Sequence, residues 1–285
     1  RRGVAESMQV VETIKDLHEW REGISGTVGL VPTMGYLHDG HLALVRRARE
    51  ENDQVAVSIF VNPRQFGPNE DFARYPRDTT RDLSLLRDAA VDCVFLPSVD
   101  EIYPPGFSTT VDVEGLGRRL EGLSRPGHFR GVATVVARLL NLVRPTRAYF
   151  GQKDAQQVAV VRRMTADLAL PTEIIAVPTV RDADGLALSS RNIFLSIDER
   201  TAALSLWRAL ARAEDAFTAG ERKAEVLREI VCLELELQPL VQIDYVSVAD
   251  SASFEELDLV DRPATIALAV WLGRTRLIDN VALES

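Results

Sequence analysis

Cysteine is scarce in this sequence of 285 residues: it occurs twice, as Cys93 and Cys232, with no spacing typical of a metal site. Both stand among apolar residues, which predicts buried thiols in a reducing compartment. Long hydrophobic runs are lacking too, since no uninterrupted apolar stretch reaches the ~18 residues of a membrane span. No secretory signal pattern is seen either, so we expect a cytoplasmic protein without a membrane partner.

Positive charge is in deficit. Lys and Arg number 33 against 42 Asp and Glu, which gives a net charge of −9. Broad nucleic-acid binding needs a basic surface that displaces phosphate counterions, so we expect no nucleic-acid partner. A local basic pocket for a nucleotide is still compatible with this balance. Hydrophobic residues at 46% and charged residues at 26% are typical of a globular protein and exclude a disordered one.

The first 180 residues alternate between strand-like and helix-like segments. Strands are expected at 27–32, 54–61, 92–96, 147–150 and 173–177. Helices are expected at 41–52, 80–90, 131–143 and 155–168. Such alternation indicates βαβ units and a parallel sheet, which binds ligands at the carboxyl ends of its strands.

After Arg181 the pattern changes. Ser196 and Glu199 form a capping box that predicts the start of a long helix. Helices are expected at 197–218 and from there to about 237, and antiparallel strands at 241–248 and 264–272. The predicted fold is therefore α/β: a Rossmann-like parallel-sheet domain at 1–180 and a smaller C-terminal α+β lid domain at 181–285. The segment 179–190, which contains Asp-Gly, is the expected hinge.

Two of the four histidines stand in His38-Asp39-Gly40-His41, between a predicted strand and a predicted helix. Chance would give roughly 0.003 matches to H-x-G-H in a chain of this composition, so the motif is significant. A helix N-terminus binds phosphate, glycine permits close approach, and imidazoles donate hydrogen bonds. The alternatives are one core and one surface histidine, or a zinc site, for which a third ligand is not evident.

The H-x-G-H motif resembles the signature of the nucleotidylyltransferase superfamily, which includes class I aminoacyl-tRNA synthetases. Longer segments resemble, in order, five motifs of the pantothenate synthetase (pantoate–β-alanine ligase) family. They are PTMGYLHDGH at 32–41, FVNPRQF at 60–66, RPGHFRGV at 125–132, GQKDAQQ at 151–157 and LSSRN at 188–192. The segment LIDN at 277–280 resembles the C-terminal part of the same family.

The resemblance implies an enzyme: an AMP-forming acid–amino-acid ligase of coenzyme A precursor biosynthesis. Such a ligase joins pantoate to β-alanine through a pantoyl adenylate and releases pyrophosphate and AMP. ATP is then a substrate, Mg²⁺ accompanies its phosphates, and the partners are the small molecules pantoate, β-alanine and ATP. The resemblance also implies a homodimer.

The resemblance also assigns the site residues. The catalytic set is His38, His41, Lys153, Ser189, Ser190 and Arg191. The nucleotide-binding set adds Met34, Gly35, Tyr36, Leu37, Asp39, Gly40, Gly151, Gln152, Asp154, Val180 and Leu188. The substrate-binding set is Pro32, Thr33, Met34, Asn62, Gln65 and Gln157, and Asp82 is a candidate Mg²⁺ ligand. These types fit the chemistry, because adenylation needs cations and hydrogen-bond donors rather than a protein nucleophile.

Three positions depart from the family's common residues: Gln152 replaces Glu, Leu188 replaces Met and Arg64 replaces Met. The position of Arg64 next to Gln65 leaves its effect on substrate fit open. His128 and Arg130 are expected either in a flexible loop or at a helix start.

The main alternative function is a nucleotidylyltransferase that acts on another small substrate, in which the Gln65 and Gln157 motifs are not expected. An aminoacyl-tRNA synthetase is disfavoured by the acidic charge and the short remaining chain. A non-catalytic nucleotide-binding module is disfavoured because every charged motif residue is kept.

Overall fold

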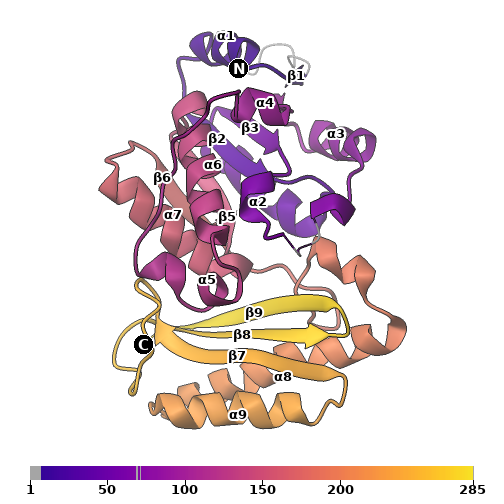
Figure 1. The fold of residues 1–285 in the computed structure, drawn as a ribbon, viewed down its shortest axis with the longest axis vertical. Helices are drawn as coiled ribbons and strands as arrows, with labels where there is room; N and C mark the ends of the chain where they lie inside the picture. The colour runs from indigo at the N-terminus through magenta and orange to yellow at the C-terminus, as the bar shows by residue number, and fades with distance from the viewer. Residues whose placement is uncertain (1–7, 69, 71, 285) are drawn as a thin grey trace. The chain divides into compact units, whose positions relative to one another are not determined.

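The computed structural model describes residues 8–68, 70 and 72–284, which form two compact units (Figure 1). The first unit runs to Gln152 and resumes at Val160–Pro178. The second unit comprises Lys153–Ala159 and the chain from Thr179 onward. The division therefore falls within one helix, α7 (Ala155–Asp167), as well as near the expected hinge.

A six-stranded parallel sheet forms the centre of the first unit. Its strands are β1 (Gln9–Val11), β2 (Val28–Thr33), β3 (Gln54–Ile59), β4 (Cys93–Phe95), β5 (Arg147–Gly151) and β6 (Glu173–Val177). They lie in the order β1-β4-β3-β2-β5-β6, and every neighbouring pair is parallel. The predicted α/β class with a parallel sheet is confirmed.

The strand order reverses direction at β2. From this strand the chain adds β3 and β4 on one side, and later β5 and β6 on the other. In open α/β sheets the carboxyl ends of the strands at such a switch point form the usual ligand site. The H-x-G-H segment follows β2, and Gly151-Gln152 ends β5 and begins the next turn, so both lie at this edge of the sheet.

Helices cover the sheet on both sides, and α2 (Asp39–Glu51) packs against β2, β3 and β5. The other helices of this unit are α1 (Ile14–Glu22), α3 (Thr79–Asp88), α4 (Val99–Ile102), α5 (Glu121–Ser124) and α6 (His128–Val143). Short 3-10 turns occur at η1 (Pro63–Gln65), η2 (Phe72–Arg74), η3 (Leu116–Arg118) and η4 (Gln152–Asp154). Strand β2 is buried along nearly its whole length, as expected for a parallel strand covered on both faces.

Helix α6 is largely apolar and almost entirely buried, with Val132, Leu139 and Val143 among its core residues. It has 16 residues and packs against α1 and β2. Among the helices that the structure describes, none combines the length and apolar character needed to cross a membrane.

The second unit has a three-stranded antiparallel sheet in the order β7-β8-β9 and two long helices. The helices are α8 (Ile197–Thr218) and α9 (Ala224–Glu236), and the short 3-10 turn η5 (Ser190–Phe194) precedes them. The strands are β7 (Val241–Asp250), β8 (Ala264–Leu272) and β9 (Thr275–Leu283). The predicted capping box is confirmed, because Ser196 and Glu199 exchange both hydrogen bonds at the start of α8.

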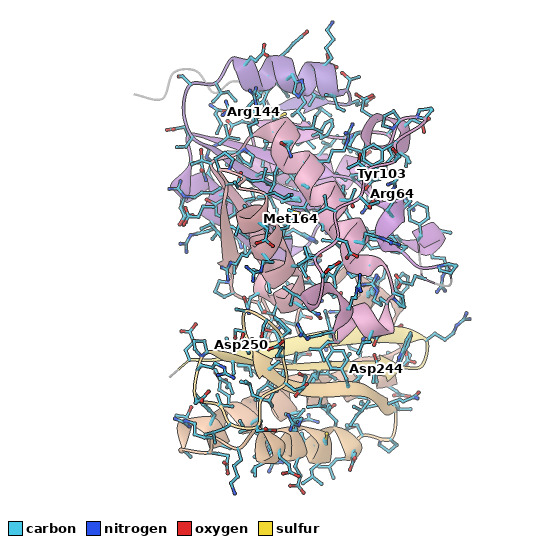
Figure 2. All side chains as sticks on the ribbon, turned by 60° about the vertical axis from the view of Figure 1, so that its left-hand side comes forward. Arg64, Tyr103, Arg144, Met164, Asp244 and Asp250 are labelled. Atoms are coloured by element: carbon cyan, nitrogen blue, oxygen red, sulfur yellow. The ribbon has the colours of Figure 1, made fainter. Side chains whose placement is uncertain are left out.

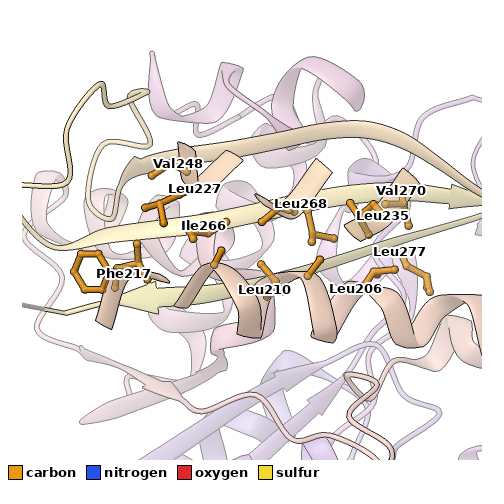
Figure 3. Close-up of a cluster of buried hydrophobic side chains, with 14 of the residues drawn as sticks. Leu206, Leu210, Phe217, Leu227, Leu235, Val248, Ile266, Leu268, Val270 and Leu277 are labelled. Carbon is orange, nitrogen blue, oxygen red and sulfur yellow. The ribbon is translucent and has the colours of Figure 1, made fainter. Parts of the chain in front are cut away.

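One apolar core joins the two helices to the sheet (Figure 3). Leu206 and Leu210 of α8 and Leu227 of α9 pack with Ile266 and Leu268 of β8, and all five are buried. Strand β9 was not predicted from the sequence. Its buried residues include the polar Asp279 and Asn280, which interrupt the apolar alternation that would have identified it as a strand.

Candidate active site

The loop between β2 and α2 adopts a rare backbone conformation. Gly35 has φ of +81° and Tyr36 has φ of +52°. A Cβ at Gly35 would lie 2.9 Å from Cγ2 of Ile59, so both the backbone angle and the close approach require glycine. A positive φ at a bulky residue such as Tyr36 costs ~1–3 kcal/mol and persists only where the surroundings hold it.

Asp82 of α3 supplies that support. Its Oδ2 accepts the N–H of Tyr36 at 2.7 Å and its Oδ1 accepts the N–H of Leu37 at 2.8 Å. The Asp82 side chain is fully buried. Arg81, the preceding residue, donates to the carbonyl oxygen of Leu37 at 2.9 Å. Asp82 and Arg81 of α3 therefore fix two N–H groups and one carbonyl oxygen of the loop backbone.

His38 and His41 cap the N-terminus of α2. The N–H of Gly40 donates to Nδ1 of His38 at 3.2 Å, and the N–H of His38 donates to Nδ1 of His41 at 3.3 Å. The two ring centroids are 4.0 Å apart. Because each Nδ1 acts as an acceptor, the proton of each neutral ring is on Nε2, which makes Nε2 a donor.

This arrangement suits an anion. The first N–H groups of an α-helix lack partners in the helix, and the helix dipole adds positive potential at the same end. Two imidazole donors, one at the N-cap position and one in the first turn of α2, extend this donor set. The site is therefore able to hold phosphate oxygens and to stabilise charge that develops on them.

Gln65 lies on η1, near Met34 of the β2–α2 loop. Its Nε2 donates to the sulfur of Met34 at 3.2 Å, and its Oε1 accepts from Nδ2 of Asn62 at 3.1 Å. The structure thus brings together three of the predicted substrate-binding residues. Pro32 and Thr33 end β2; the Thr33 hydroxyl turns inward and donates to the carbonyl oxygen of Ser58 at 2.9 Å.

Helix α6 packs directly on the turn that carries Gln65. A Cβ at Gly131 would lie 2.1 Å from the carbonyl oxygen of Arg64, so only glycine permits this contact. His128, the first residue of α6, places Nδ1 at 2.9 Å from the carbonyl oxygen of Gln65. Of the two roles expected for His128, the structure shows the one at a helix start, as an anchor for the Gln65 backbone.

The hydrogen bonds of His128 define its protonation. Nδ1 must donate to the carbonyl oxygen of Gln65, and Nε2 accepts from Nη1 of Arg125 at 3.1 Å. Burial, followed by the nearby positive charge of Arg125, lowers the pKa of His128 to about 4. His128 is therefore neutral near pH 7. Arg125 in turn forms an ion pair with Glu70 at 2.6 Å.

The second unit contains the predicted cations. Lys153 is largely buried; its Nζ lies 3.8 Å from Oδ1 of Asp154, and its carbonyl oxygen accepts from Nδ2 of Asn280 at 2.8 Å. Asn280 follows Asp279, which forms a two-pronged ion pair with Arg181 at 2.6 and 2.9 Å. The backbone of Lys153 is thus tied to a buried polar network. Gln157 lies in the first turns of α7 and is half-buried.

The segment before Ser189 forms a small hairpin. Arg181 bridges Ala187, and the N–H of Leu188 donates to the carbonyl oxygen of Val180 at 3.0 Å. Ser189 then caps η5, because its Oγ accepts the N–H of Arg191 at 3.3 Å. The structure therefore places these predicted residues on one segment, 180–191, which forms the hairpin and then η5. Ser190 is buried there.

Within the described residues, no group of three or more His, Cys, Asp or Glu side chains is arranged to hold a metal ion. Asp82, the candidate Mg²⁺ ligand, already accepts two backbone N–H groups. Both carboxylate oxygens are thus already used to hold the loop, and the side chain is fully buried. The geometry favours Asp82 as an anchor of the loop.

Tyr103 is a residue that the sequence did not reveal. It follows α4, is buried, and its hydroxyl donates to Oδ1 of Asn62 at 2.8 Å. The two residues are 41 positions apart. No local pattern signals such a pair; only the packing of the chain after α4 against η1 creates it.

A parallel sheet whose switch point carries an imidazole-capped helix N-terminus defines a nucleotide-binding protein of the α/β class. Comparison with known proteins narrows this class. The model of the Pantoate-beta-alanine ligase family matches residues 9–282. The chain therefore belongs to the pantoate-beta-alanine ligase family, and the resemblance seen in the five motifs is confirmed.

Individual relatives agree over nearly the whole chain. The pantothenate synthetase of Roseiflexus sp. (strain RS-1) is 57% identical over 278 residues, which cover 98% of this chain and 100% of the relative. A crystal structure of pantothenate synthetase from Thermus thermophilus has a TM-score of 0.92 and 49% identity, covering 96% of this chain and 99% of that chain. A pantoate-beta-alanine ligase from Francisella tularensis, complexed with beta-gamma ATP and beta-alanine, has a TM-score of 0.80 and 36% identity, covering 96% and 97%.

Proposed function

We propose that this chain condenses pantoate with β-alanine at the expense of ATP, with the two capping histidines of α2 acting on the nucleotide phosphates. The chain is an ATP-dependent ligase of the pantoate–β-alanine type. The observation that carries the assignment of roles is the double Nδ1 capping by His38 and His41, which makes both Nε2 atoms donors at an anion-binding helix end. The alternative, a nucleotidylyltransferase for another substrate, is not favoured by the family match.

In the first step, an oxygen of the pantoate carboxylate attacks the α-phosphorus of ATP. A carboxylate–phosphorus bond forms, the bond to the β-phosphate oxygen breaks, and pyrophosphate leaves. The negative charge on the transferring phosphate rises during this step, so donors fixed beforehand lower the barrier. His38 and His41 are assigned this role, and Gly40 keeps the backbone close to the phosphates.

Lys153 and Arg191 are assigned to balance the negative charge of the phosphates. Ser189 and Ser190 are assigned to donate hydrogen bonds to the phosphate oxygens. An ammonium group acts as a point charge, whereas a guanidinium can bind two oxygens at once. The tie between Asn280 and the Lys153 carbonyl supports this assignment, because it fixes the backbone from which the ammonium group extends. Asp154, Gln152 and Gly151 keep their assignment to nucleotide binding.

Gln65 and Gln157 are assigned to pantoate. An amide offers a donor and an acceptor, which suits an acid that carries hydroxyl groups. In the second step the amine of β-alanine attacks the acyl carbon of the adenylate. The amide bond forms, the bond to the AMP oxygen breaks, and the amine proton is released to solvent or to AMP.

Magnesium, assembly and location complete the proposal. We expect Mg²⁺ to enter with ATP, held mainly by its phosphates, because such ions retain water and use few protein ligands. A homodimer is proposed from the family resemblance, and gel filtration with light scattering tests it. The buried free thiol of Cys93 supports a cytoplasmic location.

The experiment that tests the function measures all products. The purified chain with ATP, Mg²⁺, pantoate and β-alanine should give pantothenate, AMP and pyrophosphate in equal amounts. ADP as product, or turnover that does not need β-alanine, would contradict the proposal. His41→Ala should lower the rate ~10²–10³-fold, the usual loss for one such donor. His18→Ala, on α1, is the matched control and should keep the wild-type rate.

A further inference from the structure

Asn62 makes four hydrogen bonds within the protein. Its Oδ1 accepts from the Tyr103 hydroxyl at 2.8 Å and from the Arg64 N–H at 3.2 Å. Its Nδ2 donates to the carbonyl oxygen of Gly131 at 3.1 Å and to Oε1 of Gln65 at 3.1 Å. The side chain is only 1% exposed. A primary amide has two donor hydrogens and two acceptor lone pairs, so these bonds use its whole capacity.

Two of these partners fix the direction of the network. The backbone N–H of Arg64 can only donate, and the backbone carbonyl of Gly131 can only accept. The amide of Asn62 therefore has one orientation. It follows that the Tyr103 hydroxyl must donate to Asn62, and that Gln65 must turn its oxygen toward Asn62.

The nitrogen of Gln65 is then the end available to a ligand. It donates to the thioether of Met34, which is a weak acceptor. A carboxylate or hydroxyl oxygen of a bound acid would be a better acceptor and would replace this contact. The network thus fixes the Gln65 nitrogen, a donor, as the end of the amide that faces Met34 and the acid.

We propose that Tyr103 is a positioning residue for the acid-binding site, which acts through Asn62 on the amide of Gln65 and does not touch the substrate. The proposal rests on the proposed function in one respect, namely that Gln65 binds pantoate. It assigns to Asn62 an indirect role as well, because all its hydrogen bonds are made inside the protein.

The surroundings of Tyr103 keep its hydroxyl a donor. The guanidinium carbon of Arg64 lies 4.3 Å from the centre of the Tyr103 ring. Both residues are labelled in Figure 2. Phe107 packs on the same ring with a centroid distance of 5.2 Å. Burial raises the pKa of Tyr103 to about 12, so the hydroxyl keeps its proton across the physiological range.

Arg64, which replaces the family's common methionine, therefore has a defined place. Its guanidinium also lies 4.7 Å from the centre of the Phe107 ring, and Nη2 contacts the carbonyl oxygen of Phe107 at 3.4 Å. The Arg64 guanidinium thus packs over both rings of the Tyr103–Phe107 pair.

Tyr103→Phe tests the proposal, because it removes the hydroxyl and keeps the ring. We expect the KM for pantoate to rise about 5-fold, the factor that corresponds to one net hydrogen bond, while the KM for ATP changes less than about 2-fold. Tyr149→Phe is the matched control. Tyr149 is also buried and its hydroxyl accepts from Nδ2 of Asn52 at 2.7 Å, on a different side-chain network. It should leave the KM for pantoate unchanged.

A double-mutant cycle separates positioning from general destabilisation. In a Gln65→Ala background, Tyr103→Phe should change the KM for pantoate less than about 2-fold, because its target is gone. An unchanged KM in the single variant, or an equal penalty in both backgrounds, would overturn the proposal. Wild-type enzyme that forms no pantothenate would instead overturn the proposed function.

A second variant covers the case in which Tyr103→Phe does not fold. Asn62→Asp cannot donate to Gln65, so the Gln65 amide should turn its oxygen toward the acid. The KM for pantoate should then rise more than about 10-fold with little change in the KM for ATP, since a lost and reversed contact exceeds one hydrogen bond. Equal effects on both KM values would contradict the proposed action of Tyr103 on Gln65 through Asn62.

Discussion

Asp82 accepts the backbone N–H of Tyr36 at 2.7 Å, and this bond holds a tyrosine at a φ of +52°. The loop that leads into α2 is therefore kept in a strained conformation by a residue of another helix. Under the proposed function this strain matters, because the direction of this loop determines where His38 and His41 lie relative to the end of β2. Pre-organised donors need such support, since any reorganisation during the reaction would add to the barrier.

Asp82→Asn should destabilise the loop and weaken ATP binding. An amide has one oxygen, so either the N–H of Tyr36 or that of Leu37 would face an NH₂ group instead of an acceptor. The expected loss in the free energy of unfolding is ~1–3 kcal/mol, as for a buried donor left without a partner. Chemical denaturation measures this loss, and initial rates against ATP concentration should show a raised KM.

Asp88→Asn is the control for this substitution, since Asp88 lies on the same helix and is exposed. It should change stability by less than ~0.5 kcal/mol. If Asp82→Asn kept wild-type stability and instead required more Mg²⁺ for full rate, the anchoring role would be refuted in favour of metal binding.

Local rules were enough to predict several of the elements that carry the candidate site residues. The helix after H-x-G-H, the capping box at Ser196 and the parallel sheet all follow from short-range patterns, and the structure confirms them. The structure also shows that the predicted helix at 41–52 begins two residues earlier, at Asp39, because His38 caps it with an imidazole nitrogen. Imidazole is not among the usual capping groups, which explains the shifted start.

Other features could not be predicted, because they depend on contacts between distant segments. The bond from Tyr103 to Asn62 spans 41 positions and that from Tyr36 to Asp82 spans 46. Strand β9 was missed because Asp279 and Asn280 are polar but buried, and their partners are Arg181 and Lys153. A buried polar residue cannot be recognised from its own segment, since its partners decide whether burial is tolerated.

His128 should make the protein less stable in mild acid. Its pKa is lowered from 6.5 to about 4 in the folded state, so the unfolded chain binds the proton first as the pH falls. Stability that is complete above pH 6.5 is therefore lost progressively down to about pH 4, by up to ~3 kcal/mol for this group alone. The carboxylates of Glu70 and Glu121 face the same ring and oppose this shift.

Thermal unfolding between pH 7.5 and pH 4.5 measures the effect. His128→Asn retains a donor for the carbonyl oxygen of Gln65 but has no ring to titrate. This variant should be less stable than wild type at pH 7.5, and the difference should shrink as the pH falls, because only wild type carries the His128 penalty. If the unfolding temperatures of the two proteins fell in parallel as the pH is lowered, His128 would not contribute to the pH dependence of stability.

Arg181→Met should destabilise the second unit. Asp279 is 1% exposed and binds Arg181 with both oxygens, so the substitution leaves a buried carboxylate without its cation. The expected cost is ~3–5 kcal/mol. Arg163→Met is the control, because the Arg163–Asp167 pair is about 60% exposed on both sides and should contribute less than ~0.5 kcal/mol. Equal midpoints of unfolding in the two variants would contradict a structural role for the Arg181–Asp279 pair.

Gly131→Ala should displace the turn that carries Gln65. The added Cβ would lie 2.1 Å from the Arg64 carbonyl oxygen and 2.7 Å from the Gln65 Cα, and both of these neighbours are backbone atoms that cannot rotate away. We expect a loss of ~1–3 kcal/mol in stability, typical of overpacking, and a raised KM for pantoate with the KM for ATP nearly unchanged. Gly23→Ala makes the same substitution where the nearest contact would be an ordinary 3.5 Å, so it should leave both KM values at the wild-type level. If Gly131→Ala raised the two KM values equally, α6 would not support the acid-binding turn in particular.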